Sequence, residues 1–184
     1  GFRTVQVRWH RGWMIAAEGS RENPPLLACK PATLARWVFD NLHVAGRNHG
    51  FCAVGHSNGS SGIAYMLSRY NMDDLFSMVV MEAGPNWARI DHSCIPHPAF
   101  PQLQDDYGGR STIDWAFGYP NDGNGPCGRQ NSAYTHMFRQ AGIFDGSSGN
   151  YSYPDTRIAV IIGDEDESAT ARHAEYYMER LAGG

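Results

Sequence analysis

Residues 51–67 read FCAVGHSNGSSGIAYML, and this stretch decides the fold that we expect. Its first five residues, FCAVG, are almost all apolar, which is typical of a strand buried on both faces of a parallel sheet. The small and apolar residues over 60–70 favour a helix packed closely on that sheet. Between the strand and the helix stands Gly55-His56-Ser57-Asn58-Gly59, a G-x-S-x-G motif. The stretch therefore predicts a strand, a tight turn centred on Ser57, and a helix.

The motif predicts a nucleophilic serine. A serine on a tight strand-to-helix turn has a strained backbone and an exposed hydroxyl group. We expect Gly55 and Gly59 to be needed because a Cβ atom at either position would clash in such a turn. The helix directs its free N–H groups and positive end toward a developing oxyanion, and Asn58 supplies one of those N–H groups. The alternative interpretation is a glycine turn with a purely structural role.

The rest of the chain alternates strands and helices, which predicts βαβ units and an α/β fold with a mainly parallel sheet covered by helices on both faces. The expected strands are 2–9, 51–55, 76–81 and 157–162, and the expected helices are 31–42, 60–70 and 169–181. Gly, Pro, Asn, Asp and aromatic residues dominate residues 85–153, where only two short stretches, 111–117 and 132–141, favour helices. We therefore divide the chain into a core (1–84), an inserted cap (85–153) and a return to the core (154–184).

An acidic turn, Gly163-Asp164-Glu165-Asp166-Glu167-Ser168, follows the late strand RIAVII. Together with the G-x-S-x-G turn and the strand after it, this turn makes the chain resemble the α/β-hydrolases. The resemblance implies a Ser-acid-His triad in which Ser57 is the nucleophile and Asp166 orients the histidine, with Asp164 as the second candidate. The alternative is a solvated acidic helix start, because Asp and Glu favour that position.

The histidine of such a triad is not evident in the sequence. The resemblance implies a histidine after a final strand, whereas only His173 follows Asp166, within the expected helix 169–181. We expect His56 to face away from Ser57 and to be a pocket-wall or packing residue. The resemblance also implies a strand between 2–9 and 51–55 in the sheet, which is absent, and a second oxyanion donor that we cannot assign. We therefore expect an internal piece of a longer protein, with its histidine beyond Gly184.

The four cysteines form no C-x-x-C pair, which argues against a zinc ribbon or a thioredoxin-like motif. Their even number and wide spacing favour two disulfides in a secreted protein, paired Cys29–Cys52 and Cys94–Cys127; the alternative is four free thiols. Asp91, His92, Cys94 and His97 are zinc-ligand types at no standard spacing. Residues 164–175 match a calcium loop imperfectly. We therefore expect neither a metal nor a cofactor.

Composition limits the class of protein further. With 42% hydrophobic and 18% charged residues the chain can bury a core, which excludes global disorder. The net charge of −4 and the lack of a basic block argue against a nucleic-acid partner, and no apolar run is long enough to span a membrane. Within these limits, the resemblance to the α/β-hydrolases implies a secreted serine hydrolase that acts on small-molecule or polymer esters of carboxylic acids. The alternative is a non-catalytic scaffold of the same fold that binds a partner.

Overall fold

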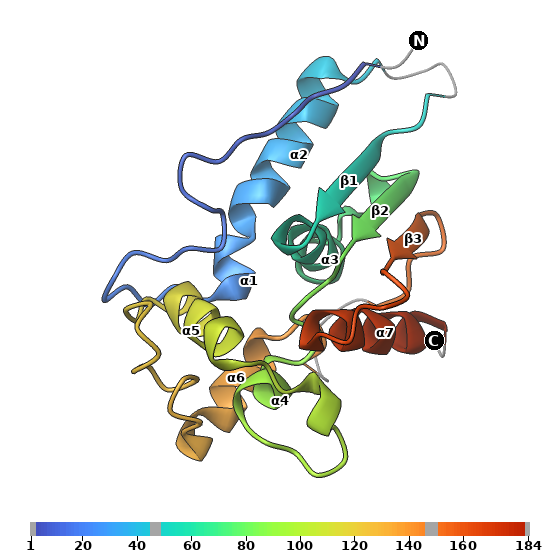
Figure 1. The fold of residues 1–184 in the computed structure, drawn as a ribbon. Coiled ribbons are helices and arrows are strands. Elements are labelled where there is room, and N and C mark those ends of the chain that lie inside the picture. The colour runs from blue at the N-terminus through green and yellow to red at the C-terminus, as the bar shows by residue number, and fades with distance from the viewer. Residues whose placement is uncertain (1–2, 45–48, 146–150, 183–184) are drawn as a thin grey trace.

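The structure, a computed structural model, describes residues 3–44, 49–145 and 151–182. In chain order its elements are α1 (Pro24–Leu27), α2 (Cys29–Leu42), β1 (Cys52–His56), α3 (Asn58–Tyr70), η1 (Met72–Asp74), β2 (Met78–Glu82), α4 (Ile90–Cys94), η2 (Pro101–Leu103), α5 (Tyr107–Ala116), η3 (Ser132–Tyr134), α6 (Thr135–Ala141), β3 (Arg157–Ile161) and α7 (Ala169–Ala182). All three strands, and the helices α2, α3 and α7, overlap segments predicted from the sequence. Figure 1 shows the strands side by side, with α3 next to β1.

The three strands form one parallel sheet in the order β1-β2-β3. His56 pairs with Glu82, which in turn pairs with Ile161, so the carboxyl ends of all three strands meet at one edge. Because α3 connects β1 to β2, the arrangement contains the crossover that parallel neighbours require. The α/β class predicted from the sequence is therefore present, as a small parallel sheet with helices.

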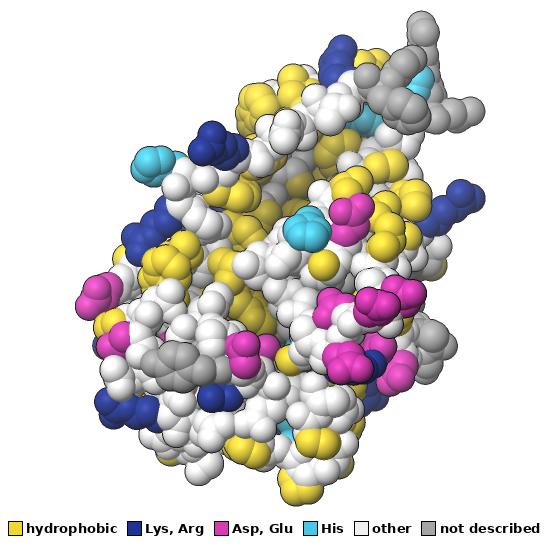
Figure 2. All heavy atoms as spheres, in the orientation of Figure 1, with side chains coloured by type: hydrophobic (Ala, Val, Ile, Leu, Met, Phe, Trp, Pro, Cys, Tyr) yellow, Lys and Arg dark blue, Asp and Glu magenta, His cyan; other side chains and the backbone are white. Residues whose placement is uncertain are grey.

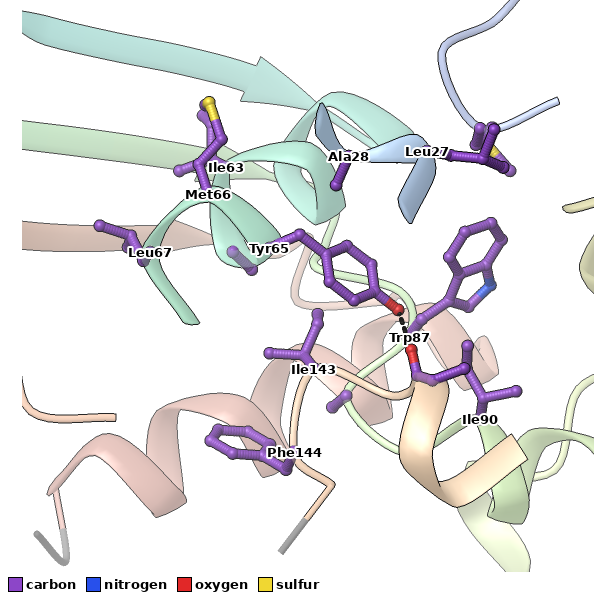
Figure 3. Packing of buried hydrophobic residues seen from close by; sticks show 14 of the residues in the cluster. Leu27, Ala28, Ile63, Tyr65, Met66, Leu67, Trp87, Ile90, Ile143 and Phe144 are labelled. Carbon is purple, nitrogen blue, oxygen red and sulfur yellow. Dashed lines mark hydrogen bonds between the residues drawn. The ribbon is translucent and has the colours of Figure 1, made fainter. Parts of the chain in front are cut away.

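The core lies between α3, the sheet face it covers, and the segment after β2. Val79 and Met81 of β2 are fully buried. Tyr65 of α3 is also fully buried, and its hydroxyl donates to the backbone oxygen of Ala141 at 2.7 Å. Figure 3 shows this bond among the apolar side chains that surround the ring. Burial raises the pKa of Tyr65, so the hydroxyl stays protonated and keeps α3 bound to the end of α6.

The opposite face of the sheet is open, which corrects the expectation of strands buried on both faces. Val54 is 69% exposed and Ile161 is 54% exposed, and Cys52 and His56 are exposed beside them. Figure 2 shows hydrophobic side chains gathered at this surface. The apolar composition of FCAVG indicated a buried strand, but burial depends on a second helical layer, and the described helices leave this face to solvent.

The predicted strand over 2–9 is also wrong. Phe2 lies outside the described residues, and residues 3–9 form no strand. Val5 and Val7 are 42% and 44% exposed, and Figure 1 shows this segment running past α2. The alternation of FRTVQVRW suits a strand, but a strand forms only beside another strand that satisfies its backbone groups. No described strand lies next to this segment.

The segment after β2 contains α4, α5 and α6 and is held by a disulfide between Cys94 and Cys127, as predicted. The buried carboxylate of Asp114 on α5 accepts the backbone N–H groups of Cys127 and Gly128, both at 2.8 Å. The disulfide and the two hydrogen bonds to Asp114 therefore order a region that has few long helices. The exposed Cys29 and Cys52, by contrast, are free thiols.

The predicted Cys29–Cys52 pairing fails for a geometric reason. Cys29 begins α2, a helix of 14 residues that carries the chain about 20 Å at 1.5 Å per residue. Phe51, which precedes Cys52, packs on Phe39 and His43 at the far end of that helix. A disulfide requires Cα atoms within roughly 7 Å of one another.

Candidate active site

Ser57 occupies a turn of a single residue, because β1 ends at His56 and α3 begins at Asn58. Its backbone has φ 52° and ψ −115°, a conformation that costs free energy in any residue with a side chain. The Ser57 N–H donates to the Glu82 oxygen at 2.8 Å, and the Ser57 oxygen accepts from the Ser60 N–H at 2.9 Å. The tight turn that the motif predicts is present, and bonds on both sides of Ser57 hold it.

Gly55 is the glycine that this turn requires. A Cβ atom at Gly55 would lie 2.5 Å from the carbonyl carbon of Gly59 and 2.7 Å from the nitrogen of Ser60. Both are backbone atoms that no rotamer change can move. A Cβ atom at Gly59 would meet no heavy atom within 4 Å, so the expectation that both glycines avoid a clash is correct for Gly55 alone.

The first N–H groups of α3 are available to a ligand. Within the described part of the chain, the N–H groups of Asn58 and Gly59 donate to no protein acceptor. Helix starts leave such donors free and carry partial positive charge. The position beside Ser57 can therefore stabilise a developing negative charge on oxygen.

A second strained residue stands beside Ser57 at the same edge of the sheet. Ala83 directly follows β2, has φ 46°, and donates its N–H to the Ile161 oxygen at 2.9 Å. A Cβ atom at the next residue, Gly84, would lie 3.0 Å from the Ser57 oxygen and 2.9 Å from the Ser60 Cβ. The chain after β2 is thus packed directly against the serine turn.

The acidic turn lies at this edge too, because it follows β3. Asp166 is half-buried and accepts the backbone N–H of Ser168 at 2.9 Å, whereas Asp164 is exposed. Side-chain and backbone hydrogen bonds from Ser168 lower the pKa of Asp166, which is therefore ionised at neutral pH. One strand, β2, separates the strand before Ser57 from the strand before Asp166, so the two strands lie about 10 Å apart.

No imidazole is hydrogen-bonded to Ser57 in the described ranges, which include all eight histidines. His56 is exposed on the open sheet face, with its Nδ1 atom 3.9 Å from Glu82 Oε2. Of the two roles expected for His56, packing is wrong, because no described element covers that face. The structure thus brings the serine turn and the acidic turn to one edge without a base between them.

His173, which belongs to α7, is fully buried, in contrast to the exposed His56. Its Nε2 atom lies 2.8 Å from Ser93 Oγ and 3.0 Å from the Leu103 oxygen, so it joins α7 to the segment after β2. Burial lowers the pKa of His173 to about 4, which keeps the ring neutral. These contacts exclude the ring from solvent and fit a structural role.

The candidate metal ligands do not form a site. Cys94 is in a disulfide and is lost as a ligand. His92 instead stacks on Phe100, with ring centroids 4.9 Å apart. No group of His, Cys, Asp and Glu suited to holding a metal ion occurs among the residues that the structure describes. In addition, none of the helices described is long and apolar enough to cross a bilayer.

Two residues at this site are not indicated by the sequence. Trp13 donates its indole N–H to the Asn58 oxygen at 3.0 Å, and Asn86 donates its side-chain amide to Asn58 Oδ1 at 2.9 Å. They are separated from Asn58 by 45 and 28 residues. A lone Trp in a loop and an Asn after a strand carry no local pattern that predicts such contacts.

No protein-family model, curated protein or solved structure matches this chain.

Proposed function

We propose that this chain carries the nucleophile of a serine hydrolase of the α/β-hydrolase type, acting on carboxylic esters. The observation that supports this most strongly is the backbone of Ser57, at φ 52° and ψ −115° between a strand and a helix. Strained non-glycine residues persist where the surrounding structure enforces them, commonly at functional sites. Here the strained turn holds a half-buried serine directly beside the free N–H groups at the start of α3.

In the proposed reaction the Ser57 Oγ attacks the acyl carbon and its proton passes to an imidazole. The Asn58 N–H stabilises the oxyanion of the tetrahedral intermediate, which expels the alcohol with the proton returned by the imidazole. The acyl group left on Ser57 is then hydrolysed by water, which releases the carboxylic acid and regenerates the serine. Asp166 orients the imidazole and stabilises its protonated form. Since the described histidines make no bond to Ser57, we propose that a histidine outside these 184 residues supplies the base.

The order of the strands supports the pairing of Ser57 with Asp166. Both follow strands of one parallel sheet at the same edge, with β2 between those strands. An imidazole that enters from beyond this edge meets the hydroxyl on one side and the carboxylate on the other. The disulfide between Cys94 and Cys127 supports the proposal of a secreted protein, because disulfides persist in oxidising compartments.

The test is covalent labelling of the full-length protein with a fluorophosphonate, which reacts with activated serines. We expect labelling of Ser57 and its loss in Ser57→Ala, while the matched variant Ser77→Ala, at a serine outside the turn, retains it. Labelling that persists in Ser57→Ala would show that another residue is the nucleophile.

A second function, a non-catalytic scaffold of the same fold that binds a partner, is favoured by the Ser57 hydroxyl, which has no hydrogen-bonded imidazole among the residues that the structure describes. If neither wild type nor Ser57→Ala reacts with the probe, and the coding sequence beyond residue 184 contains no histidine after a further strand, this second function is the correct one.

A further inference from the structure

Three segments that are distant in the sequence meet at Asn58. They are the loop that contains Trp13, the start of α3, and the chain after β2 that contains Asn86. Asn58 is the residue whose N–H we assign to the oxyanion. Its side chain and its carbonyl oxygen are each bonded to a different one of the two other segments.

Asn86 holds Asn58 and the first turn of α3 together. Its side-chain amide donates to Asn58 Oδ1 at 2.9 Å, and its backbone N–H donates to Ser61 Oγ at 2.9 Å. The tight approach of Gly84 to Ser57 and Ser60 fixes the chain two residues before Asn86. Asn86 is therefore anchored against the helix start at both its side chain and its backbone.

Trp13 holds Asn58 from another direction. It is 4% exposed, and its indole N–H donates to the Asn58 oxygen at 3.0 Å. A Cβ atom at Gly62 would lie 3.4 Å from the indole, so the absence of a side chain there lets the ring approach α3. Lys30 Nζ donates to the Trp13 oxygen at 3.2 Å and fixes the loop to α2.

We infer that Trp13 and Asn86 are positioning residues that hold the first turn of α3 so that the free N–H groups of Asn58 and Gly59 face the oxyanion, an inference that rests on the proposed function. The peptide that carries the Asn58 N–H is held by the bond from the Ser60 N–H to the Ser57 oxygen, whereas the Asn58 oxygen belongs to the next peptide, which carries the free Gly59 N–H. An oxyanion donor contributes only when its N–H is held in the productive direction before the reaction. The bond from Asn86 fixes the Asn58 side chain, and the bond from Trp13 to the Asn58 oxygen fixes the peptide that carries the Gly59 N–H.

The test compares hydrolysis of a p-nitrophenyl ester by variants of the full-length protein. Asn86→Ala removes the donor to Asn58, and Trp13→Phe removes the indole N–H while keeping an aromatic ring. Asn41→Ala and Trp37→Phe are the matched controls, because both residues lie on the exposed part of α2. We expect kcat to fall about tenfold in Asn86→Ala and in Trp13→Phe, with KM changed less than twofold.

A double-mutant cycle isolates the bond between Asn86 and Asn58. Asn58→Ala keeps the backbone N–H and loses only the side-chain contact, so it should lower kcat as much as Asn86→Ala does. The double variant should be no slower than either single variant, because both remove the same bond. Equal activity of Asn86→Ala and Asn41→Ala would overturn the inference.

Amide hydrogen exchange over residues 57–62 gives a readout that does not depend on catalysis. We expect faster exchange there in Asn86→Ala and in Trp13→Phe than in the two controls. If Ser57→Ala hydrolyses the ester as fast as wild type, the proposed function fails, and the exchange measurement alone decides whether the two residues hold Asn58. Unchanged exchange would then refute the restraint.

Discussion

A methyl group on Gly55 would lie 2.5 Å from the carbonyl carbon of Gly59, whereas a methyl group on Gly59 would touch nothing within 4 Å. The two glycines of the G-x-S-x-G motif therefore differ in their structural roles. Gly55 lets the end of β1 pass directly against the first turn of α3. That approach fixes the position of Ser57 between them.

The first prediction follows from this difference. Gly55→Ala should lower the free energy of unfolding by about 3 kcal/mol or more, because the clash is with backbone atoms and requires the strand and helix to separate. Gly59→Ala should leave stability unchanged or raise it by about 0.5 kcal/mol, since alanine favours a helix. Urea denaturation measures both variants, and equal destabilisation by the two would contradict the assignment.

The second prediction concerns the strain at Ser57. Glycine adopts φ 52° with little penalty, and alanine does not. Ser57→Gly should therefore be more stable than Ser57→Ala by about 1 kcal/mol, although both lack the hydroxyl group. Thermal unfolding of the two variants provides the comparison, with Ser77→Gly and Ser77→Ala as the pair for an unstrained position. A Ser57 pair that behaves like the Ser77 pair would show that the turn carries no strain.

The third prediction concerns pH. Because burial holds the pKa of His173 near 4 while the unfolded chain titrates near 6.5, the unfolded state binds the extra proton between these values. The free energy of unfolding should therefore fall as the pH drops from 7 to 4, by up to about 3 kcal/mol from this residue. Asp105, whose pKa burial raises to about 6, should oppose part of that fall.

His173→Gln tests this dependence, because glutamine retains a donor for the Leu103 oxygen and does not titrate. Urea denaturation at several pH values should give a shallower slope for His173→Gln than for wild type. The control is His136→Gln, an exposed histidine whose replacement should preserve the slope. Identical slopes in all three proteins would show that His173 is not the buried group responsible.

The fourth prediction concerns the cysteines. Alkylation of the unfolded protein without reductant should modify two thiols, Cys29 and Cys52, and reduction should expose two more. The disulfide closes a separation of 33 residues, for which loop entropy predicts about 3–4 kcal/mol of stabilisation. Cys94→Ala with Cys127→Ala should lose that stability, whereas Cys29→Ser with Cys52→Ser should keep it.

The fifth prediction separates the two carboxylates of the acidic turn. If Asp166 is the acid of the proposed triad, Asp166→Asn should lower kcat by about 10³-fold or more, because an amide does not stabilise a protonated imidazole. Asp164→Asn should change kcat less than twofold. Ester hydrolysis by the full-length protein measures both variants, and a larger loss in Asp164→Asn would transfer the role to that residue.

Local sequence determined the elements that need only their own residues. The apolar runs before Gly55 and before Gly163 predicted β1 and β3, and the G-x-S-x-G motif predicted the turn at Ser57, because strand length, helix pattern and turn chemistry are short-range properties. The pairing of Cys94 with Cys127 was also predicted correctly. The pairing of Cys29 with Cys52 was not, because the 14 residues of α2 lie between the two cysteines in the chain and separate them in space.

Tertiary structure decided what depends on a partner element. Residues 3–9 have the sequence pattern of a strand but no neighbouring strand among the described residues. Val54 is an apolar residue of a strand, yet it is exposed because no described helix covers its face of the sheet. The bonds from Trp13 and Asn86 to Asn58 join residues far apart in the chain, so no local pattern indicates them. The sequence by itself thus determined the strained serine and the turn that holds it. Only the packing of distant segments decided which faces are buried and which side chains hold the first residue of α3.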